Sequence, residues 1–172
     1  MINFSIDISD KFFGKLKEKR LTTFLGEIIK KSINIEVLKD INFNIKVVDK
    51  KAMDKVSKDY IHATPIGMFD STNMIIYILY NRDKSNMEDT YFHELGHLID
   101  FIIGKKNGLN GCFSDYEDIS AIMESDKRFL NYIYADIPKE FFAQSFSEYY
   151  RKTSNSIMMF ETKKLFKTLK VA

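Results

Sequence analysis

Two histidines four positions apart, with a glutamate after the first, form the pattern in this chain that best suits chemistry: His93-Glu94-Leu95-Gly96-His97. Four residues make about one helical turn, so both imidazoles would project from one face of a helix and could share a tetrahedral zinc ion. Glu94 would then take a proton from a water molecule that zinc activates. Gly96 would leave room for close packing beneath the metal. The pattern predicts a zinc-dependent metallopeptidase.

A catalytic zinc ion needs a third protein ligand, and the residue counts narrow the choice. The remaining histidine, His62, precedes the motif, and no histidine follows His97. The single cysteine, Cys112, excludes both an internal disulfide and a four-thiolate zinc site. We therefore expect a carboxylate from the downstream part of the chain. The candidates are Asp115, Glu117, Asp118, Glu124, Asp126, Asp136, Glu140, Glu148 and Glu161.

Glu140 is the favoured candidate among these carboxylates. It would lie in the first turn of an apolar helix, beside Phe141 and Phe142, where a carboxylate without a partner would be costly. Glu148 shares its face two turns later. The alternative interpretation of Glu140 is an acid that only favours the dipole at the start of its helix.

The elements around these residues follow from hydrophobic periodicity, turn residues and capping residues. Together they predict an α+β fold in which a hairpin leads directly to the histidine-bearing helix. The expected elements are a helix at about 9–31, a strand at 41–47, a helix at 51–60, strands at 66–69 and 74–80, a helix from Ser85 or Asn86 to near Gly104, a helical stretch at 119–134, a helix from Asp136 or Pro138 through Tyr150, and a helical segment at 163–169.

Length and composition indicate one ordinary globular domain over residues 1–172, which we expect to be a monomer. The chain is 45% apolar and 29% charged, with a formal net charge of +2, so it gives no electrostatic reason to expect nucleic acid or a membrane as partner. No segment resembles a signal peptide or a membrane span. We expect a cytoplasmic protein, or a secreted one if a signal peptide has been removed.

Two motifs carry a resemblance to a known family. HELGHLID, followed further along the chain by EFFAQSFSEYY, resembles the catalytic domain of anthrax lethal factor and the related bacterial Pro-Pro endopeptidases, whose pattern is HExGHxxD and then EFFAEAF. The resemblance covers about residues 60–160. It implies a zincin-like fold, one zinc ion per chain and hydrolysis of peptide bonds in a protein or peptide substrate. It also implies His93, His97 and Glu140 as ligands, with Glu94 as the base.

The chain departs from the family pattern at two positions of the second motif. Gln144 stands where a second glutamate is usual, and Ser145 where alanine is usual. The Gln144 carbonyl can still accept an imidazole N–H, but it carries no charge, so zinc affinity would be lower. Asp100 lies one turn beyond His97, where it could accept a hydrogen bond from a ligand imidazole or form an ion pair along the helix.

The tyrosine that the resemblance implies as oxyanion stabiliser does not align cleanly. In the related enzymes it lies seven residues before the glutamate ligand, and Ile133 holds that position here. Tyr134 is favoured, because Tyr134 and Ala135 keep the Tyr-Ala beginning and a one-residue loop deletion explains the shift. Tyr132 is the alternative and would require an insertion.

We therefore expect a zincin-like domain with a small twisted mixed sheet packed on the HExxH helix and the Glu140 helix below. Substrate would lie extended along the edge strand near 66–69, as an added strand, with main-chain contacts at Gly67 and Met68. One alternative is a cytosolic regulatory metallopeptidase of a mobile element. Another is a zinc-stabilised binding or effector module that cleaves nothing.

Overall fold

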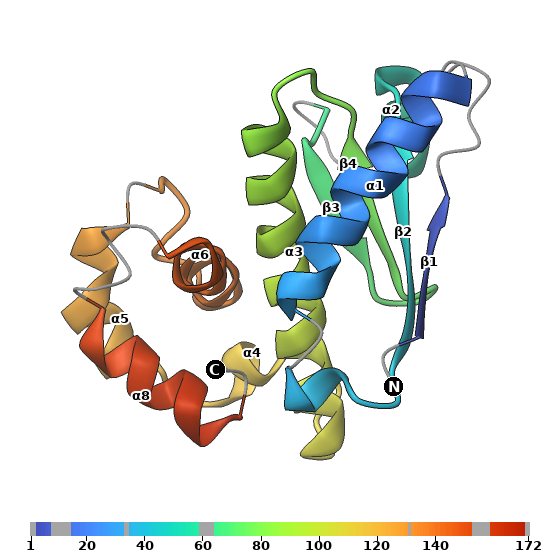
Figure 1. The fold of residues 1–172 in the computed structure, drawn as a ribbon. Coiled ribbons are helices and arrows are strands. Elements are labelled where there is room, and N and C mark those ends of the chain that lie inside the picture. The colour runs from blue at the N-terminus through green and yellow to red at the C-terminus, as the bar shows by residue number, and fades with distance from the viewer. Residues whose placement is uncertain are drawn as a thin grey trace.

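The computed structural model describes residues 3–7, 15–32, 35–58, 64–130, 132–152 and 159–170, with side chains from Lys19 onward. These residues form an α+β fold (Figure 1), as the periodicity predicts. The elements are β1 (Asn3–Asp7), α1 (Lys15–Ser32), η1 (Glu36–Leu38), β2 (Asn42–Val48), α2 (Lys50–Val56), β3 (Gly67–Asp70), β4 (Ile75–Leu79), α3 (Lys84–Lys106), α4 (Phe113–Tyr116), α5 (Ser120–Asp126), η2 (Lys127–Phe129), α6 (Pro138–Arg151) and α8 (Phe160–Thr168).

The sheet has four strands in the order β1-β2-β4-β3. β1, β2 and β4 run parallel, and β3 pairs antiparallel with β4, so the sheet is mixed. β3 lies at an edge, as predicted. The turn before β4 forms because the Asp70 carboxylate accepts the backbone N–H groups of Thr72 and Asn73 at 3.0 and 3.1 Å.

Helices α1 and α3 cover one face of this sheet (Figure 1). The pattern along β2 places Phe43, Ile45 and Val47 in the core, where alternate side chains of a strand share one face. These side chains pack with Leu25 of α1 and Leu95 of α3 in one apolar cluster. α3 therefore has its position fixed on one side by the sheet.

α6 lies on the side of α3 that faces away from the sheet, and α5 and α8 lie beyond it (Figure 1). α6 begins at Pro138, as expected for a proline in the first helical turn. A second apolar cluster joins these helices: Ile119, Met123, Leu130, Ala135, Phe141 and Met159.

The bounds of α3 differ slightly from the prediction. Asp83, not Ser85 or Asn86, is the N-cap, because its carboxylate accepts the Ser85 backbone N–H at 2.9 Å. Gly104 lies inside the helix, which continues to Lys106. A Cβ at Gly104 would lie 2.1 Å from the carbonyl oxygen of Gly111, so this glycine allows the following loop to pack on the helix.

The helical stretch expected at 119–134 ends earlier in the structure, because α5 is followed directly by η2, which ends at Phe129. α5 ends at Asp126, and the buried Asp126 carboxylate accepts both the backbone N–H and the hydroxyl of Thr162 at 2.8 Å. Tyr132 and Tyr134 therefore lie in a loop before α6.

Other predicted helices shift by a few residues. α2 ends at Val56, and α8 begins at Phe160. The expected start of the first helix and the end of the second, together with His62, lie outside the described residues. Within the described part, no helix is both long and apolar enough to cross a membrane.

Candidate metal centre

α3 and α6 cross with their chains running in opposite directions. His97, His93 and Asp89 of α3 contact Glu140, Gln144 and Ser147 of α6, in that order. The crossing is close at Gly96, where an added Cβ would lie 2.7 Å from the Ala143 Cα. The absence of a side chain at Gly96 therefore lets α6 approach the histidine face of α3, as the sequence predicts.

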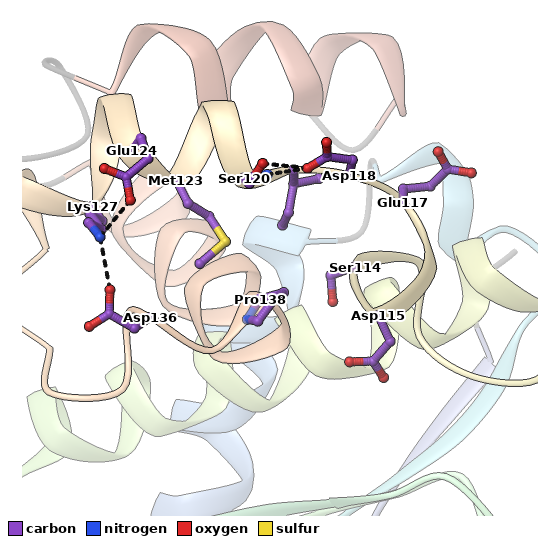
Figure 2. Close-up of a pocket in the computed structure, with 11 residues that line it drawn as sticks. Ser114, Asp115, Glu117, Asp118, Ser120, Met123, Glu124, Lys127, Asp136 and Pro138 are labelled. Carbon is purple, nitrogen blue, oxygen red and sulfur yellow. Dashed lines mark hydrogen bonds and ion pairs between the residues drawn. The ribbon is translucent and has the colours of Figure 1, made fainter.

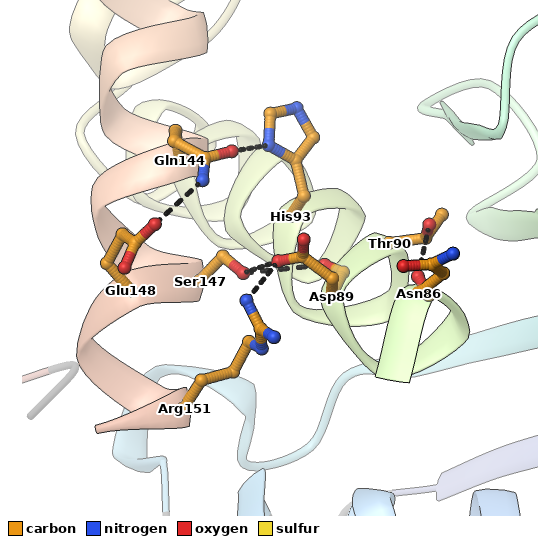
Figure 3. Close-up of polar contacts among 8 residues, drawn as sticks. All are labelled: Asn86, Asp89, Thr90, His93, Gln144, Ser147, Glu148 and Arg151. Atoms are coloured by element: carbon orange, nitrogen blue, oxygen red, sulfur yellow. Dashed lines mark hydrogen bonds and ion pairs between the residues drawn. The ribbon is translucent and has the colours of Figure 1, made fainter. Parts of the chain in front are cut away.

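A polar contact ties the two helices together away from the histidines. The Asp89 carboxylate accepts the Ser147 hydroxyl at 3.0 Å and the Arg151 guanidinium at 2.8 Å (Figure 3). Asp89 lies one helical turn before His93. The crossing of α3 and α6 is thus fixed by groups other than the candidate ligands.

His93, His97 and Glu140 present their ligand atoms to one point. One nitrogen or oxygen from each lies within 4.8 Å of the others. Nε2 of His93 lies 3.3 Å from Oε2 of Glu140, and Nε2 of His97 lies 3.6 Å from Oε1 of Glu140. Donors at the 2.0–2.1 Å bond lengths of tetrahedral zinc lie about 3.3 Å from one another. The two histidine–glutamate separations are thus close to this value, and the three residues could hold a metal ion.

Charge within the site also favours cation binding. Burial works against ionisation of Glu140, but hydrogen bonds from His93 and His97 outweigh it and hold the pKa of this carboxyl well below its usual range. For His93, burial lowers the pKa, but the Glu140 and Glu94 carboxylates and the Gln144 oxygen together more than reverse this, so the pKa is raised. A metal ion would have to displace the His93 proton, because an imidazole binds metal only when that nitrogen is free.

Glu94 is buried beside this group, with 7% of its surface exposed. Burial raises its pKa, while the two histidines and the Phe69 backbone amide act in the opposite direction. Gly67 of β3 leaves the space for this side chain, because a Cβ there would lie 2.6 Å from Oε1 of Glu94. A carboxylate with a raised pKa is a stronger base than an ordinary one, which suits it to accept and return a proton.

Gln144 contacts the first histidine, in the way expected of it. Its amide oxygen lies 3.1 Å from Nδ1 of His93, on the ring edge away from Glu140. Its amide nitrogen donates to Oε1 of Glu148 at 3.2 Å (Figure 3). His93, Gln144 and Glu148 thus form a hydrogen-bonded row that runs from the candidate ligand His93 to the Glu148 carboxylate.

Asp100 has its carboxylate bonded elsewhere. It is fully buried and accepts the Ser114 backbone N–H at 2.9 Å as well as the Ser114 hydroxyl. Burial raises its pKa to about 6, against the influence of these bonds and of His97. Asp100 joins α3 to α4, and neither an imidazole nor a basic side chain is among its hydrogen-bond partners in the described residues.

The structure brings Tyr132 closer to the candidate ligands than the sequence suggested. Its hydroxyl donates to Oε2 of Glu140 at 2.9 Å, and its ring meets the His93 ring edge-on, with centroids 5.5 Å apart. Tyr134 is half exposed and packs on Tyr132 with centroids 5.7 Å apart. The sequence could not place Tyr132 there because a helix was expected through residue 134.

The edge strand β3 runs beside the site. Leu79 donates its backbone N–H to the Ile66 carbonyl at 2.8 Å, so the antiparallel register turns the backbone groups of Met68 toward β4. Those of Gly67 and Phe69 point away from β4. For main-chain contact with another chain, the register therefore favours Gly67 and Phe69 over Met68.

Several other acids considered as ligands lie around a separate cavity of about 340 Å³ (Figure 2). Lys127 at this cavity is held by ion pairs to Glu124 and Asp136 at 2.8 and 3.0 Å. His93, His97 and Glu140 do not line it.

No protein-family model matches the chain, and no curated protein matches it.

Proposed function

We propose that the chain is a zinc-dependent endopeptidase that hydrolyses peptide bonds in a protein or peptide substrate. The observation that carries this proposal is the convergence of His93, His97 and Glu140, with the buried Glu94 beside them. Two imidazoles and one carboxylate are a known ligand set for catalytic zinc in peptidases, and they leave a fourth position for water or substrate.

Zinc is the metal that suits these donors best. The site offers two imidazole nitrogens and carboxylate oxygens, whereas magnesium and calcium prefer oxygen alone. Such an ion acts as a Lewis acid that activates water at neutral pH and polarises the peptide carbonyl.

Glu94 would act as the general base and then as the general acid. Its carboxylate takes a proton from the attacking water and passes it to the nitrogen of the leaving amine. Burial raises its pKa, which makes the carboxylate a better proton acceptor. A phenol would stabilise the oxyanion. Of the two candidates, the contact with Glu140 favours Tyr132 over Tyr134.

The substrate would bind as an extended strand along β3. The outward backbone groups of Gly67 and Phe69 could pair with it, although the Phe69 amide also interacts with Glu94. An edge strand above an HExxH helix, with a second helix that supplies a glutamate, is consistent with a zincin-like domain of the lethal factor and Pro-Pro endopeptidase type.

The test is cleavage of a diverse peptide library, Pro-Pro peptides included, by zinc-loaded protein with mass-spectrometric detection. We expect defined products from the wild type and a loss of roughly 10²–10⁴-fold in Glu94→Gln, which keeps shape but not the base. Glu88→Gln, on the same helix and paired with Lys31, is the control and should retain activity. A zinc-loaded wild type that cleaves nothing would instead support a zinc-stabilised binding module.

A further inference from the structure

We propose that Glu148 is a positioning residue: it holds the Gln144 amide so that its oxygen faces Nδ1 of His93. The inference rests on the proposed zinc site and names a residue that neither family motif assigns. Glu140, Gln144 and Glu148 follow one another at intervals of four, so they form one row along α6.

The orientation of the Gln144 amide follows from its two partners. The two ends of a side-chain amide have nearly the same shape, but the oxygen accepts a hydrogen bond and the NH₂ group donates one. The hydrogen-bond partners therefore decide which end faces which neighbour. The Gln144 nitrogen donates to Oε1 of Glu148, at 3.2 Å, and a carboxyl oxygen can accept this bond. The oxygen is then left for His93, at 3.1 Å.

This orientation selects the form of His93 that a metal needs. An amide oxygen accepts only from N–H, so Nδ1 of His93 keeps its proton. Nε2, which faces Glu140, is then the nitrogen that would give up its proton to a metal ion. If the amide were reversed, its NH₂ would face Nδ1 and favour the tautomer with a proton on Nε2. Glu148 thus prevents a reversal that would block metal binding.

Burial of Glu148 strengthens the argument. Only 8% of the Glu148 surface is exposed, and the helix that carries it is rich in phenylalanine and tyrosine. A carboxylate is seldom buried without partners to satisfy it. Because neighbouring hydrogen bonds polarise one another, the bond from Gln144 to Glu148 would also make the Gln144 oxygen a better acceptor. Glu148, one turn further along α6, would then offset the lack of a charge at Gln144.

The test is a double-mutant cycle on zinc affinity, measured by competition with a chelator. In the natural chain, Glu148→Gln should weaken zinc binding by roughly tenfold, the lower part of the range for groups that orient metal ligands. In a Gln144→Glu chain the new carboxylate accepts from His93 directly, and Glu148 adds only a like charge. There the same Glu148→Gln change should leave zinc affinity unaltered or raise it.

Controls separate this role from simple destabilisation. Glu161→Gln removes the same charge on α8 and should leave zinc affinity unchanged, and circular dichroism checks the fold of each variant. Solvent exchange of the His93 Nδ1 proton, followed by NMR, should accelerate in Glu148→Gln. An equal effect of Glu148→Gln in both chains, or none in either, overturns the positioning role. A wild type that binds no zinc overturns the proposed zinc site instead.

Discussion

Gly96 of α3 lies directly against Ala143 of α6, so close that a Cβ on Gly96 would stand 2.7 Å from the Ala143 Cα and 3.0 Å from its carbonyl oxygen. Both atoms belong to the backbone of a helix and cannot rotate away. The distance between the histidines and Glu140 therefore depends on the lack of a side chain at this position.

Gly96→Ala is expected to push α6 away from α3. Overpacking of this kind lowers the free energy of unfolding by about 1–3 kcal/mol, and the shift of Glu140 should weaken zinc binding as well. Urea unfolding of the metal-free protein and zinc titration measure the two effects. Gly26→Ala in α1 is the control, since nothing lies within 4 Å of its added Cβ. That variant should be neutral or more stable by about 0.5–1 kcal/mol. Equal stability of both variants would contradict the close crossing.

The ligand set predicts about one zinc ion per chain. Metal analysis of purified protein should show this ratio, and His93→Ala, His97→Ala or Glu140→Ala should lose the ion, because each removes one of three donors. Glu148→Ala should still bind one ion, with lower affinity. Equal loss in the Glu148 and Glu140 variants would show that the ligand on α6 has been misassigned.

The two tyrosines can be separated by kinetics. Tyr132→Phe should keep the fold and the zinc ion but lower kcat by roughly 10²–10³-fold, the usual effect of losing one oxyanion donor. Tyr134→Phe should lower kcat less, because Tyr134 is half exposed and packs on Tyr132. The reverse ranking would return the role to Tyr134, as the sequence alone favours.

Asp100 should make the protein less stable as the pH rises. Burial raises its pKa from the ordinary 3.8 to about 6, so between these values the unfolded chain releases a proton that the folded chain keeps. Stability from this group is complete below pH 3.8 and is lost as pH rises through 6, by up to about 3 kcal/mol. Asp100→Asn should abolish this loss in urea unfolding from pH 4 to 7 with chelator present.

The control for this pH effect is a carboxyl of opposite behaviour. Asp118 is exposed, and hydrogen bonds from Ser120 lower its pKa. Its contribution to stability is therefore lost as pH falls, and Asp118→Asn should not reproduce the Asp100→Asn difference. A free energy of unfolding that responds identically to pH in wild type and Asp100→Asn would rule out the titration of Asp100.

The features predicted from the sequence are those with local causes. His93, Glu94 and His97 share a helix, and their spacing alone puts both imidazoles on one face. Glu140 follows Pro138, which marks the start of α6. The hairpin of β3 and β4 also has a local cause, because the turn residues Asp70, Thr72 and Asn73 separate two strand-like runs.

The features that the sequence did not reveal depend on distant partners. β1 pairs in parallel with β2, in a register that joins Asn3 to Asn42, and no nearby residue indicates this partner. The Asp126 carboxylate, at the point where α5 passes into η2, binds Thr162 on α8. Helical structure ends with η2 at Phe129, and the loop that follows places Tyr132 beside Glu140. The bond between Asp100 and Ser114 likewise joins two elements that periodicity treats separately.

The contact of Asp89 with Ser147 and Arg151 has a consequence for chain entropy. His97 and Glu140 are roughly 40 residues apart. An ion that joined them in an unfolded chain would have to close this loop, which costs conformational entropy. Here Asp89 and Arg151, at 2.8 Å, help to close the loop without an ion. Small zinc domains fold only when they bind metal, whereas this chain should fold and bring its metal ligands together before the ion binds. A chelator should therefore empty the site without unfolding the protein, and added zinc should refill it without a folding step.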